Sequence, residues 1–109
     1  MESILKTQRG ICFWCGAYGP THLHHIIHAG VSKKTQEKMG LVCYLCPFCH
    51  NDLHDHIPDE QGRDRDFVLK PLAQQAWELK YIVEEYPYHN HALEAAREEW
   101  MRQIGRSYL

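Results

Sequence analysis

Two C-x-x-C pairs constrain this chain more than any other feature of its sequence. Cys12-Phe-Trp-Cys15 and Cys46-Pro-Phe-Cys49 are separated by 30 residues. A C-x-x-C turn can direct two thiolates toward one point, and two such turns supply the four ligands of a tetrahedral zinc ion. The spacing therefore predicts one closed, structural zinc site made by Cys12, Cys15, Cys46 and Cys49.

The size of the chain gives such a site a role in folding. At 109 residues the sequence suits a single small domain, which we expect to span 1–109. A small core gains from a metal because the free energy of metal binding becomes free energy of folding. We see no signal peptide and no apolar run of about 18 residues, so we expect a cytoplasmic protein without membrane contact. Cysteines stay reduced there, which favours metal ligation over disulfides.

The segment 12–56 contains the residues that could bind metal or take part in a reaction, and its pattern predicts a ββα unit. We expect a strand over 22–27, a short helix over 32–39, a strand over 41–45, and a helix from Pro47 to about His56. Ser32 should cap the short helix and Gly40 should end it. Cys43 lies in the apolar second strand and is expected to be a buried free thiol.

The residue pattern of the remainder of the chain, 66–109, predicts a helical extension that follows a polar loop. We expect one helix over 71–85, a break at Tyr86-Pro87-Tyr88, and a last helix capped by Asn90 and ended by Gly105. Helical periodicity favours core positions for two sets of apolar residues, namely Leu72, Ala76, Leu79 and Val83 with Trp77 in the first helix, and Leu93, Trp100, Met101 and Ile104 in the second. The fold class is therefore α+β.

Four histidines have the spacing of a second, chemical site. His50 and His54 are four residues apart, so they share one face of a helix. His24 and His25 are adjacent on a strand, so they point to opposite sides. One of that pair can join His50 and His54 around a divalent metal, and the other is then free to act as a general base near neutral pH. We expect the other five histidines to be ordinary polar residues.

This arrangement resembles the HNH nucleases of the ββα-metal type, with an added four-cysteine zinc knot that is treble-clef-like. The residues that carry the resemblance are His24-His25-Ile26, the apolar strand after them, and the run from Leu45 to His54. The resemblance implies that His24, His50 and His54 hold a second divalent metal (Mg²⁺, Mn²⁺ or Zn²⁺) and that His25 is the base. It implies endonucleolytic cleavage of DNA.

A narrower resemblance extends to the segments 38–45 and 99–109, which look like small phage and prophage proteins grouped with the RecA-dependent, recombination-enhancing nucleases. It implies DNA as the partner, possible contact with a recombination protein, and the cytoplasm of a bacterial host cell as the location. The oligomeric state is not implied by either resemblance.

The sequence departs from the HNH pattern at one position. The middle Asn of the motif would fall near Gly40-Leu41, where no Asn occurs. His56 competes with His54 as the final ligand. The net charge of −2 leaves only local patches for DNA contact, of which Lys33, Lys34 and Lys38 are the best candidates. The alternative hypothesis is therefore a non-catalytic, zinc-stapled module that binds DNA or protein.

Overall fold

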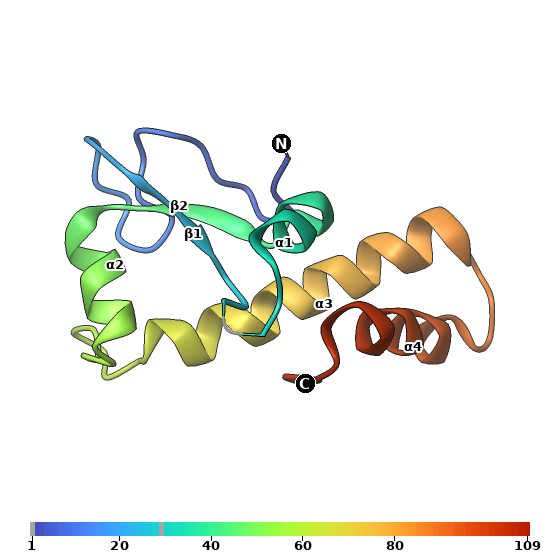
Figure 1. The fold of residues 1–109 in the computed structure, drawn as a ribbon. Helices are drawn as coiled ribbons and strands as arrows, with labels where there is room; N and C mark the ends of the chain where they lie inside the picture. The colour runs from blue at the N-terminus through green and yellow to red at the C-terminus, as the bar shows by residue number, and fades with distance from the viewer. Residues whose placement is uncertain (1, 29) are drawn as a thin grey trace.

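Two short antiparallel strands and the helix after them form the expected ββα unit. The computed structural model describes residues 2–28 and 30–109. Strand β1 (His22–His25) pairs with strand β2 (Val42–Leu45) so that His24 lies opposite Cys43. Helix α2 (Pro47–His54) follows β2 directly and packs on both strands (Figure 1). The β1 and α2 ends lie two residues before the positions expected from sequence.

Helix α1 (Lys33–Met39) joins the strands, and both of its predicted caps are confirmed. The Ser32 side chain accepts a hydrogen bond from the backbone N–H of Thr35, and Gly40 ends the helix with a left-handed φ of 77°. Inside the unit, Cys43 is fully buried as a free thiol, also as predicted. Local signals in this segment and the structure therefore agree.

Gly40 is where the N-terminal segment crosses the ββα unit, and its substitution should be costly. A Cβ at Gly40 would lie 2.8 Å from two backbone atoms, Glu2 O and Ile4 N. Gly105 has a similar φ of 85° with open space around it. Gly105→Ala should cost about 1–2 kcal/mol from the left-handed backbone alone, and Gly40→Ala should cost about 1–3 kcal/mol more from overpacking. Urea unfolding of both variants measures the difference, and equal losses would contradict this contact.

Helix α3 (Arg65–Glu85) begins six residues earlier than the sequence predicted. The Asp64 side chain accepts hydrogen bonds from the backbone N–H groups of Asp66 and Phe67, which satisfies the first turn. The apolar periodicity begins at Leu72, so the sequence predicted a start at about Pro71, but Pro71 lies inside the helix. Residues assigned to a polar loop thus belong to α3, and Arg65 and Asp66 are buried.

Helix α4 (Ala92–Ile104) runs back along α3, and its predicted end is confirmed at Gly105. The predicted start is wrong, because His91 rather than Asn90 precedes the first turn and makes no side-chain capping bond. The helix still begins within two residues of the expected position. Packing against α3 therefore holds this end of α4 without a polar cap.

The predicted apolar stripes are mostly exposed. Leu72, Leu79 and Val83 of α3 are 39%, 61% and 65% exposed, and Leu93 and Met101 of α4 are exposed too. The reason is that the interface between the two helices is partly polar, so apolar periodicity did not mark it. Buried Glu78 accepts two hydrogen bonds from Arg97 across that interface.

The core lies where α3 and α4 meet the ββα unit. Trp100 is fully buried there and Trp77 packs against it with ring centroids 5.7 Å apart, as the sequence predicted. Leu69 and Ala73 present the buried side of α3 to the same core. The side of α3 that packs on the core is therefore rotated by a quarter-turn or more about the helix axis from the side that the apolar periodicity predicted.

Candidate metal centres

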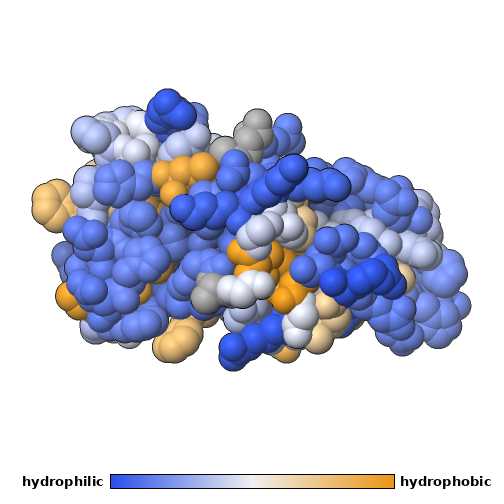
Figure 2. All heavy atoms as spheres, in the orientation of Figure 1, coloured by the Kyte–Doolittle hydropathy of each residue, from blue (hydrophilic) through white to orange (hydrophobic). Residues whose placement is uncertain are grey.

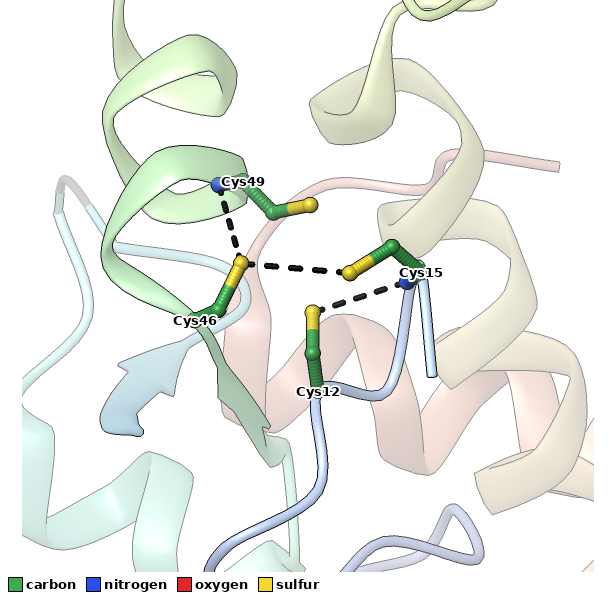
Figure 3. A group of neighbouring side chains, drawn as sticks. All are labelled: Cys12, Cys15, Cys46 and Cys49. Atoms are coloured by element: carbon green, nitrogen blue, oxygen red, sulfur yellow. Dashed lines mark hydrogen bonds between the residues drawn. The ribbon is translucent and has the colours of Figure 1, made fainter. Parts of the chain in front are cut away.

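Four cysteines from two separate segments meet at one point. Cys12 and Cys15 come from the turn before β1, whereas Cys46 precedes α2 and Cys49 lies in its first turn (Figure 3). One sulfur from each of the four lies within 4.8 Å of the others. The distance between Cys15 Sγ and Cys46 Sγ is 3.9 Å, and four thiolates at the Zn–S distance of ~2.3 Å stand roughly 3.8 Å apart. The four cysteines could therefore hold a zinc ion.

Backbone hydrogen bonds hold this group in place. The N–H of Cys15 donates to Cys12 Sγ and the N–H of Cys49 donates to Cys46 Sγ, so each C-x-x-C turn supports its first sulfur. The N–H of Phe13 donates to the carbonyl of Tyr44 and ties the first turn to β2. The sheet therefore brings the two cysteine pairs together.

Electrostatics favour at least one thiolate in this group. Burial would raise the pKa of Cys12, but the backbone N–H groups around it outweigh burial and lower that pKa to about 7. Burial raises the pKa of Cys49, an effect that nearby Arg65 opposes. Burial also raises the pKa of Cys43 to about 12. Cys43 stands outside the four-cysteine group and is suited to a buried neutral thiol.

Three of the predicted site histidines form a second group. His24 comes from β1, and His50 and His54 come from α2, with one ring nitrogen of each lying within 4.8 Å of the others. The Nε2 atoms of His50 and His54 are 3.2 Å apart. The structure therefore brings together the three residues for which a metal was expected.

His24 has the properties of a metal ligand. Its side chain is 2% exposed, and its Nε2 has no hydrogen-bond partner among the described residues. Burial first, and then the neighbouring His50, His28 and His54, lower the pKa of His24 to about 3. The ring is thus neutral, with a buried nitrogen whose lost hydration nothing in the described chain replaces. A divalent metal would satisfy that nitrogen, so these residues fit one.

His25 lies apart from this group, as adjacent positions on a strand require. Its Nε2 is 2.9 Å from Glu37 Oε2 of α1, and its side chain is 16% exposed. His56, the competitor for the last ligand position, is placed elsewhere: its Nδ1 is 2.9 Å from Asp64 Oδ2. The structure gathers His54 with the other two histidines and leaves His56 outside.

Sequence reasoning missed three residues near the histidine group. His22 Nδ1 is 3.0 Å from His50 Nδ1, so His50 has one nitrogen toward His54 and one toward His22. His28 lies against His24 and His54, and its Nε2 is 2.8 Å from Asp66 Oδ1. His24 and His28 are separated by an even number of positions, which on an extended chain places side chains on one side, and this was the available signal for His28. No local signal pointed to Asp66, 38 residues away.

Comparison of the chain with protein-family models, with curated proteins and with solved structures finds no match. None of the helices in the described ranges combines the length and apolarity needed to cross a membrane.

Proposed function

We propose that this chain is a metal-dependent DNA endonuclease of the HNH type, which hydrolyses phosphodiester bonds. The observation that carries the proposal is His24, whose buried Nε2 lacks a partner among the described residues and which groups with His50 and His54. A buried nitrogen left unsatisfied costs about 1–3 kcal/mol. A buried nitrogen that bears this cost next to two further imidazoles is typical of a metal-binding site rather than of a packed core.

The second component of the proposal is the pair of His25 and Glu37. A carboxylate only accepts hydrogen bonds, so the Nε2 of His25 carries the proton and its Nδ1 keeps the lone pair. That nitrogen is suited to take a proton from the water that attacks phosphorus. Glu37 would fix the ring orientation and stabilise the imidazolium that forms.

A divalent ion held by His24, His50 and His54 would supply the Lewis-acid chemistry that neutralises charge on the phosphate. The four cysteines supply no open position for such chemistry, because a zinc ion bound by four thiolates is coordinatively closed. We therefore assign Cys12, Cys15, Cys46 and Cys49 to structure and the histidines to the reaction.

Nicking of supercoiled plasmid tests the proposal. Wild type should cut with an added divalent metal and stop with a brief EDTA quench. His54→Ala should need at least about tenfold more metal for half-maximal cutting, because one lost ligand costs more than 1.4 kcal/mol. His56→Ala is the matched control, since it removes an exposed histidine two residues beyond the group's last member, and should behave as wild type.

Absence of cutting under every metal would favour the alternative function, a zinc-stapled module that binds DNA without cleaving it. The observation that supports this alternative is the missing Asn: Leu41 is fully buried at the position where the HNH pattern would place it. No polar side chain braces the loop from that position.

The DNA contacts of either function should involve α1. Lys33, Lys34 and Lys38 are exposed on the helix that also carries Glu37, and strongly hydrophilic side chains gather over it (Figure 2). Changing all three to Gln should weaken binding and lower the slope of log affinity against log salt by up to about 3, since each phosphate contact contributes about 0.9. Fluorescence anisotropy with labelled duplex measures both quantities.

Lys80→Gln is the control for the loss of a positive charge, because Lys80 lies on α3, away from α1 and beside Glu84. If the triple variant binds as wild type does, the DNA surface lies elsewhere. Arg97 cannot supply it, because its guanidinium is bound to buried Glu78. The exposed Arg102 would then be the next residue to test.

A further inference from the structure

The guanidinium of Arg65 lies against both halves of the four-cysteine group. Arg65 is the first residue of α3, and its Cζ is 5.6 Å from the ring centroid of Trp14, which stands inside the first C-x-x-C turn. Its side chain also interacts with that of Cys49, in the second turn. One side chain of α3 thus reaches each of the two segments that supply the cysteines.

This guanidinium is buried and incompletely paired. The Arg65 side chain is 8% exposed. One terminal nitrogen donates to the carbonyl of Ile57 at 3.0 Å, and the other lies 3.9 Å from Asp52 Oδ2. The Nε atom is buried without a hydrogen-bond partner among the described residues. A buried cation with an unused donor is costly unless an opposite charge lies beside it.

Asp52 does not supply that opposite charge in full. Its carboxylate is 38% exposed, and at 3.9 Å its oxygen is beyond hydrogen-bonding distance. The four cysteines can supply it, because four thiolates around one Zn²⁺ leave a net negative charge on the sulfurs. Burial above all, and then Cys46, raise the pKa of Cys49, whereas Arg65 opposes that rise. The guanidinium therefore favours the charged form of this sulfur.

We propose that Arg65 is the outer partner of the four-cysteine site: its guanidinium donates to the sulfur of Cys49 and offsets the charge of the zinc–thiolate centre. Arg65 positions and compensates the ligands and is not itself a ligand, because a guanidinium has no lone pair to offer. This inference rests on the structural zinc site of the proposed function and is independent of the histidines and of DNA cleavage. Removing an outer partner usually weakens metal binding by about 10–100-fold.

Arg63 provides a matched control. Its Cζ is 5.0 Å from the ring centroid of the same Trp14, so it makes the same kind of cation–π contact as Arg65. Arg63 is exposed, however, and its guanidinium is paired with Asp59 at 2.8 Å. Arg63→Met therefore removes a cation from Trp14 and leaves the proposed partner of the sulfurs in place.

Two measurements on the full chain test the inference, with Arg65→Met and Arg65→Lys as the variants. Zinc affinity is measured by competition with a chelating dye, in a His54→Ala parent so that the histidine group competes less for the ion. Each chain is also reconstituted with Co²⁺, and the energy of its sulfur-to-cobalt charge-transfer absorption is recorded. Only sulfur ligands give this band, so cobalt on the histidines does not contribute.

We expect Arg65→Met to bind zinc about 10–100-fold more weakly than its parent. Its charge-transfer band should move to lower energy, because no neighbouring positive charge stabilises the sulfur electrons. Arg65→Lys keeps the charge but loses the planar fork of donors, so its affinity and band energy should lie between those of the parent and of Arg65→Met. Arg63→Met should match the parent in both measurements.

An unchanged zinc affinity and band energy in Arg65→Met would overturn the inference. A loss of affinity with an unchanged band would also overturn it, since that result indicates packing alone. An equal shift in Arg63→Met would assign the effect to any cation over Trp14 and would contradict a specific role of Arg65.

If Arg65→Met does not fold, Arg65→Lys decides, and parental affinity and band energy in that variant would contradict the inference. If the wild type shows no sulfur-to-cobalt band, the four-cysteine metal site fails and the inference fails with it. Plasmid nicking tests the histidine site separately, so these failures are distinguishable from a failure of the proposed cleavage.

Discussion

Cys46→Ser is expected to leave the chain unfolded and free of zinc under conditions in which the wild type is folded. A structural zinc ion contributes apparent binding free energy of about 10–16 kcal/mol at pH 7, whereas small domains are stable by only about 5–15 kcal/mol in total. Cys46 also precedes α2, and its sulfur accepts a hydrogen bond from Cys49. A serine hydroxyl replaces neither a thiolate nor its bond to zinc.

Far-ultraviolet circular dichroism and zinc analysis by mass spectrometry measure this result. Cys43→Ser is the matched control, because Cys43 is buried in β2 but lies outside the four-cysteine group. It should keep one zinc ion per chain and lose only the modest stability of a buried polar substitution. A folded, zinc-free Cys46→Ser protein would rule out the structural zinc site.

His25→Ala is expected to lower the rate of plasmid nicking by about 10²–10⁴-fold, the usual contribution of a general base. His24, His50 and His54 remain to hold the metal, so zinc content, cobalt uptake and DNA affinity should stay near wild type. Single-turnover cleavage at saturating protein separates the chemical step from binding. Equal rates for His25→Ala and wild type would remove His25 from the mechanism.

Two further variants sharpen this test. Glu37→Gln keeps the size of the side chain that His25 contacts but removes its charge, so the rate should fall less than in His25→Ala. His89→Ala changes an exposed histidine between α3 and α4 and should cut as wild type does. A general loss of structure would lower the cleavage rate of all three variants to a similar extent. Loss of the base would instead make His25→Ala the slowest, Glu37→Gln intermediate and His89→Ala equal to wild type.

Local signals allowed the ββα unit to be predicted. Ser32 and Gly40 define α1 by capping chemistry within a few residues, and the C-x-x-C turns fix the cysteine pairs without reference to the rest of the chain. The opposite orientation of His24 and His25 follows from strand geometry alone. These features depend on neighbours in sequence, so a single sequence contains them.

The helical extension and part of the histidine site depended on distant contacts. Asp64 starts α3 ahead of Pro71, which only the folded chain reveals as an interior residue. The pairing of Arg97 with buried Glu78 makes part of a helix interface polar, which apolar periodicity cannot detect. The contact of His28 with Asp66 joins a loop after β1 to the first turn of α3, and no local pattern encodes it.

The first turn of α3 contacts both the cysteine group and the histidine group. Arg65 opposes the effect of burial on the Cys49 thiol, and the next residue, Asp66, holds His28. Two adjacent residues of α3 thus contact the cysteine group and the histidine group, respectively. Filling the first centre would anchor the turn that shapes the second, and by linkage the converse must hold with the same coupling free energy.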